Sequence, residues 1–226
     1  MDMKTNNKES RFGSMPAVAY QQLKSMIMDA ELAPGQKLLY ADLENRLKMS
    51  KTPIISALNR LESEGYVSLK KNAGYYVKGS QPEEILEIME ARVKLEVANI
   101  DFVIRNCTDS QLGELDKIHA DYCKYVPEVY DKKKLLMNTR FHLQMARMGG
   151  NSFMVRYIEH IYELFDLRVR FAFLPSSRVR ASAVEHEKLL DALHCRKKSE
   201  LKSLLTEHLK QPIRIIRKSL RNLEMT

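Results

Sequence analysis

Histidine and cysteine are the residues of this chain whose side chains could bind a metal ion or take part in redox chemistry. The chain contains six histidines and three cysteines, which are His119, His142, His160, His186, His194, His208, Cys107, Cys123 and Cys195. His186-Glu187 is followed by Lys188 and leucines, so the H-E-x-x-H motif of zinc proteases is missing. No C-x-x-C pair occurs, and an odd number of widely spaced cysteines indicates reduced thiols in a cytoplasmic protein. Taken singly, such histidines are more often capping or surface residues than metal ligands.

A second group of residues has the chemistry that binding to nucleic acid requires. Ser50, Lys51 and Thr52 start a predicted helix, where short polar and basic side chains can contact DNA phosphates and bases. Lys70 and Lys71 precede a predicted turn and add positive charge. This pattern favours DNA binding over the alternative of a domain that contacts only other proteins.

The elements that must position this second group are predicted within residues 17–79. In order, they are a helix over 17–30, a short helix containing Leu43 and Leu47, a turn at 48–50, a helix from there to Glu64, and strands at 66–70 and 75–77. The Ser50 side chain is expected to cap the third helix, and Gly65 to end it. This order is that of a winged helix, in which the third helix enters a DNA groove and the hairpin forms the wing.

The rest of the chain is predicted to be a long, all-helical domain over residues 83–226, because glycine and proline become scarce there. Residues 80–82 form the predicted linker, and residues 1–16 a mobile arm. The predicted helices begin at Glu83 and continue over roughly 109–125, 129–148, 151–173, 177–195 and 197–221, with Asn151 and Ser177 as N-caps and Pro212 as a kink or shift in the last helix. The expected fold class is mainly α, a winged helix-turn-helix followed by a helical bundle.

Composition and charge narrow the class of protein further. The 226 residues contain 37 Lys and Arg against 29 Asp and Glu, a formal net charge of +8, which favours polyanionic partners. The first 80 residues carry 12 basic and 8 acidic side chains, so they have about twice the positive charge per residue of the remainder. No apolar run is long enough to span a membrane, and the N-terminus lacks the apolar core of a signal peptide. We therefore expect a cytoplasmic protein.

Residues 19–77 resemble the DNA-binding domain of the GntR family of bacterial repressors. The resemblance rests on Leu32-x-Pro34-Gly35-x-x-Leu38, Leu43, Ser50-Lys51-Thr52-Pro53-Ile54, Ala57-Leu58-x-x-Leu61-x-x-Glu64-Gly65-Tyr66-Val67 and Gly74-Tyr75-Tyr76-Val77. Residues 83–220 resemble the all-helical effector-binding domain of the FadR-like subfamily, called FCD. Together the two resemblances cover about nine tenths of the chain.

The GntR resemblance implies a set of DNA-contacting residues and one departure from the family's usual operator. The implied residues are Ser50, Lys51, Thr52, Ile55, Ser56, Asn59, Arg60, Lys70, Lys71, Asn72 and Gly74. Family members usually have arginine in place of Lys51 and of Ile55, and often a basic residue in place of Ala73. Lysine is a point donor and isoleucine makes only apolar contacts, whereas arginine can hold guanine bidentately. We therefore expect a different operator, read more through A·T contacts and DNA shape.

The FCD resemblance implies a metal and effector site in the helical domain. Many FCD domains bind a divalent metal through one aspartate and three histidines, and here the matching residues are Asn138, His142, His186 and His208. Asn138 stands where aspartate is usual, and an amide oxygen lacks the anionic charge that helps to hold such a metal. Two alternatives stay open. The histidines bind Zn²⁺ or Ni²⁺, or the site is metal-free and these residues bind the effector directly.

Arginines of the helical domain admit a similar pair of interpretations. Arg92 matches a frequent arginine of the first FCD helix, where it would hold an effector carboxylate bidentately. The alternative is a salt bridge with Glu90, Glu96 or another residue of the domain. The pairs Arg168/Arg170 and Arg178/Arg180 are predicted to form a solvated face.

The sequence as a whole predicts a ligand-responsive bacterial transcriptional regulator rather than an enzyme. The expected protein is a repressor that binds a palindromic operator as a homodimer and responds to a small carboxylate. Two other functions stay open at this point. One is a metal-dependent hydrolase on the helical bundle, and the other is an interaction protein with a degenerate DNA-binding head.

Overall fold

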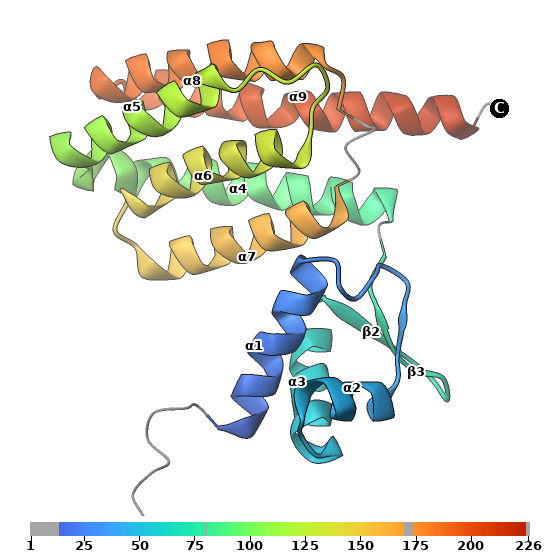
Figure 1. Cartoon of the computed structure of the whole chain (residues 1–226). Helices are drawn as coiled ribbons and strands as arrows, with labels where there is room; N and C mark the ends of the chain where they lie inside the picture. Colours follow the sequence, from blue (N-terminus) through green and yellow to red (C-terminus); the bar gives the residue numbers. More distant parts are fainter. Residues whose placement is uncertain (1–13, 80, 170–173, 225–226) are drawn as a thin grey trace, which may run out of the picture. The chain divides into compact units, whose positions relative to one another are not determined.

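The computed structural model describes residues 14–79, 81–169 and 174–224, which form two compact units (Figure 1). The first unit comprises residues 1–79 and the second residues 80–226. Most of the predicted arm lies outside the described residues, although its last two positions, from Met15, already belong to the first helix. Ser80 of the predicted linker also lies outside them, and Pro82 is the first residue of a helix.

The first unit is a small helical domain closed by a three-stranded sheet. Its helices are α1 (Met15–Met28), α2 (Tyr40–Leu47) and α3 (Lys51–Ser63). The helix α3 packs against both α1 and α2, with Leu58 and Leu61 fully buried on its inner face. It ends as predicted at Gly65, whose positive φ of 83° lets the Tyr66 amide donate to the Leu61 carbonyl over 2.8 Å.

The sheet consists of β1 (Lys37–Leu38), β2 (Val67–Lys70) and β3 (Gly74–Val77), all antiparallel, in the order β1-β3-β2. The hairpin of β2 and β3 was predicted, whereas β1 was not, because two residues are too few to show an alternating pattern. The turn between β2 and β3 holds Asn72 at φ +60° and leads into Gly74 at φ +90°. Both values lie in the left-handed region that asparagine and glycine tolerate best.

The second unit is a bundle whose helices pack against one another in a closed ring (Figure 1). Its helices are α4 (Pro82–Asn106), α5 (Asp109–Lys124), α6 (Lys132–Arg147), α7 (Ser152–Arg168), α8 (Ser177–His194) and α9 (Lys198–Glu224). The neighbours around the ring are α4, α7, α6, α5, α8 and α9, and α9 packs against α4 again. The helix α4 also contacts α6. The mainly helical fold class is thereby confirmed.

Some predicted helix ends need correction. Asn151 caps α7 as predicted. Its side-chain oxygen accepts hydrogen bonds from the backbone amides of Phe153 and Met154 in the first turn of the helix. Ser177 is not an N-cap but the first residue of α8. Ser50 occupies the N-cap position of α3 in an extended conformation, but its side chain makes no cap hydrogen bond. The helix α9 continues through Pro212, and α7 ends at Arg168, before residues 170–173, which lie outside the described part of the chain.

The prediction of a solvated arginine face is wrong for two of its four members. Arg168 is 1% exposed and its Nε lies 2.9 Å from a carboxylate oxygen of Glu84. Arg178 is 7% exposed and forms a bidentate pair with Glu185. Arg180 is exposed, and residue 170 lies outside the described residues. Arginines can be buried when a carboxylate pairs with them, and the sequence pattern does not show which carboxylate that is.

In the described ranges, no helix combines the length and the apolar character needed to cross a membrane.

Candidate functional site

Three of the predicted site residues meet in the interior of the bundle. His142 on α6, His186 on α8 and His208 on α9 are all buried, and one ring nitrogen of each lies within 4.8 Å of the others. We call them the histidine cluster. They come from three helices because α6, α8 and α9 each turn an apolar face toward the same core, and each face carries one histidine.

The other ring nitrogens of two histidines are held by carboxylates. His142 Nδ1 lies 2.9 Å from Glu96 on α4, and His208 Nδ1 lies 2.6 Å from Glu185 on α8. A carboxylate accepts a hydrogen bond, so Nδ1 of each ring carries a proton, and Nε2 is the ring atom left to meet a ligand. The two Nε2 atoms face each other at 3.0 Å. This is hydrogen-bonding distance, so the contact is satisfied when one Nε2 carries a proton, and a cation bound to both nitrogens would take the place of that proton.

His186 completes the cluster and has no hydrogen-bond partner among the described residues for either ring nitrogen. Its ring is stacked on Phe141, with centroids 4.1 Å apart and planes 9° apart. It is also 5.3 Å from the His142 ring and 4.8 Å from the His208 ring. A fully buried imidazole with both nitrogens unpartnered is costly, because its polar atoms have lost water and gained nothing in return.

One buried and one partly buried ion pair flank the histidine cluster. Arg92 Nε lies 3.2 Å from Glu96, and the Tyr162 hydroxyl donates to the same carboxylate over 2.9 Å. The guanidinium of Arg92 also lies 4.0 Å from the centre of the Tyr162 ring. On the other side, Arg178 holds Glu185 through two hydrogen bonds of 2.7 and 2.8 Å. Arg92 therefore forms the salt bridge that was one of its two predicted roles.

Burial and these pairs determine the ionisation of the site. Burial by itself would raise the pKa of Glu96, but His142 and Arg92 outweigh it and lower that pKa to about 2. The pKa of Glu185 is likewise lowered to about 2, because its hydrogen-bonded partners outweigh the effect of burial. Burial lowers the pKa of His208 to about 4 and that of His186 well below its ordinary value. His208 and His186 are therefore neutral at pH 7, while both carboxylates are ionised.

Asn138 lies beside the cluster at a small cavity of about 30 Å³. The cavity is also lined by Arg92, Arg178 and His208. A volume of this size holds one or two water molecules, far less than the roughly 300–1,000 Å³ of most small-molecule pockets. A larger surface groove of about 560 Å³ runs between α4 and α9, but none of the three histidines lines it. The cavity thus brings two arginines, one amide and one imidazole to a common point.

The donor set of the cluster fits a divalent metal such as Zn²⁺ or Ni²⁺. Three neutral imidazoles suit both ions, and the carboxylates on Nδ1 fix the ring orientations as they do in many metal sites. Such an ion would bind one of the two unpartnered nitrogens of His186 and the facing Nε2 atoms of His142 and His208. A bound divalent metal would supply a Lewis-acidic centre with positions left over for an anionic ligand.

The structure also places the residues predicted to contact DNA. Lys51, Thr52, Ser56, Asn59 and Arg60 are exposed on α3, as are Lys70, Lys71 and Asn72 at the wing, while Ile55 is half-buried. The first turn of α3 has no side-chain cap, so its amide groups face outward. Lys51 Nζ lies 4.6 Å from the ring centre of Tyr40, a contact between α3 and α2 that sequence reasoning missed.

Two of the residues predicted to contact DNA, Asn59 and Arg60, are hydrogen-bonded to other side chains of the domain. Asn59 accepts a hydrogen bond from the Tyr75 hydroxyl. Arg60 Nε lies 2.9 Å from Glu64, and its guanidinium lies 3.8 Å from the centre of the Tyr20 ring. These contacts hold both side chains on the face of α3 that meets α1 and the sheet. Lys51, which contacts only the face of the Tyr40 ring, and the exposed Thr52 and Ser56 are better placed to meet a ligand.

Sequence reasoning missed the residues that orient the cluster. Tyr162 and Glu185 were not predicted as site residues, and Glu96 was named only as one of the partners considered for Arg92. Glu96 follows Arg92 by one helical turn, a spacing that did suggest the salt bridge. The hydrogen bond between Glu96 and His142 spans 46 residues, so no local pattern could have indicated it.

Comparison with known proteins identifies both units. Residues 17–77 match the family described as bacterial regulatory proteins, gntR family, and residues 87–211 match the FCD domain. The HTH-type transcriptional repressor GlaR of Escherichia coli (strain K12) is 26% identical over 89% of this chain and 95% of its own. The Nta operon transcriptional regulator of Aminobacter aminovorans is 24% identical over 82% of this chain and 87% of its own.

Solved structures share the fold at low sequence identity. A GntR transcriptional regulator described as putative, from Rhodococcus sp. RHA1, superposes with a TM-score of 0.72 at 19% identity, covering 91% of this chain and 99% of its own. McbR/YncC of E. coli superposes with a TM-score of 0.70 at 22% identity, covering 92% and 100%.

Proposed function

This chain belongs to the GntR family of bacterial regulatory proteins and carries an FCD domain, and from that premise we propose that it is a repressor whose DNA binding is controlled by a small carboxylate at the histidine cluster. Membership makes it a transcriptional regulator. The proposal adds the operator symmetry, the dimer, the ligand class and the direction of control.

The exposed start of α3 supports the DNA-binding part of the proposal. Lys51, Thr52 and Ser56 are exposed there, and the free amides of the first turn favour a phosphate. Lys70 and Lys71 lie at the wing, where they can reach the DNA backbone. The positive charge concentrated in the first 80 residues acts in the same direction. Because Asn59 and Arg60 are held by Tyr75 and Glu64, we assign them a smaller share of base reading.

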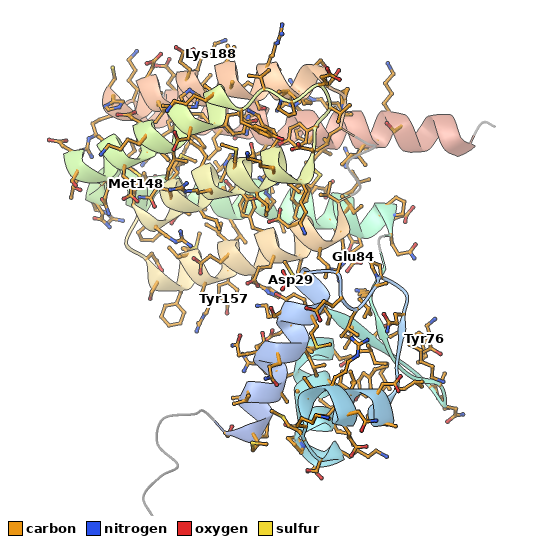
Figure 2. All side chains as sticks on the ribbon, in the orientation of Figure 1. Asp29, Tyr76, Glu84, Met148, Tyr157 and Lys188 are labelled. Carbon is orange, nitrogen blue, oxygen red and sulfur yellow. The ribbon has the colours of Figure 1, made fainter. Side chains whose placement is uncertain are left out.

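An exposed aromatic pair on α7 supports the homodimer. Phe153 is 65% exposed and Tyr157, labelled in Figure 2, is 56% exposed. They lie one turn apart, with Arg156 4.9 Å from the ring centre of Phe153. Aromatic and arginine side chains are the residues that interfaces concentrate. Two copies joined through this face would present two α3 helices to a palindromic operator.

The cavity beside the cluster supports the choice of a carboxylate. Arg92 and Arg178 line it together with Asn138 and His208, so its walls offer donors and positive charge. Arginine guanidinium groups hold carboxylates bidentately. The cavity is too small for most metabolites, so either the ligand is very small or the lining moves to admit it.

One observation carries the proposal that a metal takes part. His142 and His208 face each other through Nε2 atoms 3.0 Å apart, while their Nδ1 atoms are occupied by carboxylates. A metal would bind both Nε2 atoms and would also give the unpartnered His186 a partner. Glu96 and Glu185 are both engaged by an imidazole and an arginine, so neither is free to activate water, which weighs against the hydrolase alternative.

Ligand binding would act on DNA affinity by shifting the balance between two arrangements of the dimer. A ligand changes this balance only through a difference in its affinity for the two arrangements. A tenfold change in operator affinity needs about 1.4 kcal/mol of coupling. The histidine cluster joins α6, α8 and α9, and Glu96 links it to α4, so its occupancy can alter how these helices pack.

The experiment that tests the DNA-binding proposal is selection of bound sequences from random DNA, followed by affinity measurements at several salt concentrations. We expect a two-fold symmetric sequence, an affinity that falls steeply with salt, and a loss of about tenfold or more for Lys51→Ala. The matched control is Lys188→Ala, which removes the same charge from the exposed surface of α8 (Figure 2) and should leave affinity unchanged. Recovery of no symmetric sequence, or equal losses for both variants, would refute the proposal.

A further inference from the structure

We propose that the surface groove between α4 and α9 binds an organic acid with an extended apolar body, at a site separate from the histidine cluster. The groove has a volume of about 560 Å³, which lies within the roughly 300–1,000 Å³ of most small-molecule pockets. None of the three clustered histidines lines it. The inference therefore goes beyond the proposed metal and carboxylate site and does not depend on it.

The floor of the groove is apolar. Val93 on α4 and Ile213 on α9 line it with exposed fractions of only 8% and 5%, so they form its base. The half-buried Val97 and the exposed Ala98 continue this apolar surface along the next turn of α4. A ligand with an apolar body would be stabilised on such a concave surface, because contact with it removes that body from water.

An ion pair lies at each end of the groove. Arg217 on α9 pairs with Glu90 on α4, and Lys202 Nζ on α9 lies 2.7 Å from Asp101 on α4. Residue numbers rise along α4 from the first pair to the second and fall along α9, so the two helices run antiparallel. Residues 90 to 101 of α4 span about 16 Å at about 1.5 Å per residue. The groove is therefore long enough for an extended ligand.

Two lysines between these ends carry positive charge that no carboxylate balances. Five of the lining residues are basic, and one, Glu90, is acidic. Glu207, one turn before Lys210 on α9, is already held by Arg214 through a hydrogen bond of 3.1 Å. In the described part of the chain, neither Lys94 nor Lys210 has a carboxylate within ion-pair distance. Lys94 lies about 6 Å and Lys210 about 10 Å along the groove from its Glu90 end, so the two are about one helical turn apart on opposite walls.

One anionic group between Lys94 and Lys210 would remove this imbalance. Like charges on facing walls repel each other, whereas a carboxylate placed between them attracts both. The apolar floor and the two ammonium groups are satisfied together only by a molecule that carries both an apolar body and a negative charge. The length of the groove favours an extended body over a compact one.

The test measures binding of phenylbutyrate to the full chain by isothermal titration calorimetry, at low and at high salt. Phenylbutyrate is the probe because it carries one carboxylate on an extended apolar body. Phenylbutanol has the same body without the charge, and acetate has the charge without the body. Lys94→Gln and Lys210→Gln each remove one positive charge, and Ala98→Phe fills the groove. Lys188→Gln, at an exposed lysine of α8, is the matched control.

We expect the native chain to bind phenylbutyrate about tenfold more tightly than phenylbutanol, with a preference that shrinks at high salt, and to bind acetate too weakly to measure. Lys94→Gln and Lys210→Gln should each weaken phenylbutyrate binding by about threefold or more and leave phenylbutanol binding unchanged, whereas Lys188→Gln should change neither. Ala98→Phe should abolish binding of both ligands. His142→Ala, which alters the histidine cluster, should bind phenylbutyrate as the native chain does.

Reversing the charge of both lysines gives a gain of binding that unfolding could not produce. Lys94→Glu combined with Lys210→Glu should lose phenylbutyrate and should bind the cation phenylbutylamine about tenfold more tightly than the native chain does. If this double variant fails to fold by circular dichroism, the two glutamine variants decide alone.

Other results would overturn the inference. Absence of phenylbutyrate binding, or equal affinities for phenylbutyrate and phenylbutanol, would show that the groove does not select an organic acid. Unchanged binding in Ala98→Phe would place the acid outside the groove, and loss of binding in His142→Ala would assign it to the histidine cluster. If Ala98→Phe instead converts a dimer to a monomer in light scattering, a second copy of the chain covers the groove and the inference is wrong.

Discussion

Replacing His186 with leucine should stabilise the metal-free protein and abolish its response to metal. His186 is 0% exposed and stacks on Phe141, and neither of its ring nitrogens has a hydrogen-bond partner among the described residues. Leucine is similar in volume and has no polar atoms. The substitution therefore removes the cost of burying an unpartnered imidazole while keeping the core filled.

The magnitude follows from two opposing terms. A buried polar group without a partner costs about 1–3 kcal/mol, and His186 contains two such atoms in one ring. Loss of the stacked contact with Phe141 takes back about 0.5–1.5 kcal/mol. The net expectation is that His186→Leu raises the free energy of unfolding by about 1–2 kcal/mol in chelator.

The assay is urea unfolding followed by far-ultraviolet circular dichroism, since the chain contains no tryptophan. Each protein is measured in chelator and again with Zn²⁺ plus oxalate. A ligand present at 100 times its Kd stabilises the native chain by about 2.7 kcal/mol, and the variant should gain nothing. The order of stability should therefore reverse on adding ligand. If His186→Leu is less stable than the native chain in chelator, His186 has a structural role and the reasoning fails.

Three further predictions concern other parts of the bundle. Phe153→Asp combined with Tyr157→Asp should convert the proposed dimer to a monomer in light scattering, because the exposed α7 face would carry charge. Val184→Asp on α8, also at an exposed apolar position, should not, and a dimer that survives both changes would place the interface elsewhere. Burial raises the pKa of Asp166 from 3.8 to about 7, so the folded state favours its neutral form and the free energy of unfolding falls as the pH rises from about 4 to 7. Asp166→Asn should remove this fall and raise the free energy of unfolding by up to about 4 kcal/mol at pH 8, while Asp191→Asn should not. Parallel pH profiles of stability for native and Asp166→Asn protein would contradict the assignment. Lys134 Nζ donates to the carbonyls of Tyr122 and Tyr125 at 2.6 and 2.8 Å, so Lys134→Met should lower the free energy of unfolding by about 1–3 kcal/mol. The exposed Lys117→Met should leave it unchanged, and equal stabilities of the two variants would argue against these hydrogen bonds.

Much of the fold could be predicted from the sequence because it rests on local patterns. The apolar spacing of α3 and the glycine at residue 65 define a helix and its end within one stretch of chain. The strands β2 and β3 show enough alternation to be recognised, while β1, with two residues, does not. Ser177 resembled an N-cap because serine is common there, yet α8 starts one residue earlier than that role requires.

The histidine cluster shows where sequence reasoning reaches its limit. The family resemblance pointed to His142, His186 and His208, and the structure brings all three together. The carboxylates that orient them and the arginines that neutralise those carboxylates come from other helices, through pairings such as Glu96 with His142. Arg168 and Arg178 were predicted to be solvated for the same reason, since only the folded chain reveals the carboxylates that pair with them. Charge balance in the site therefore emerges only from the tertiary structure.

The measurement that tests the central claim most directly is the affinity of the full chain for its selected operator, followed by fluorescence anisotropy, with the histidine cluster stripped by chelator and then loaded with Zn²⁺ and oxalate. We predict that loading weakens operator binding by about tenfold or more in the native chain and leaves His142→Ala unchanged. An operator affinity that is the same in both states of the native chain, or that shifts equally in His142→Ala, would contradict control of DNA binding by this cluster.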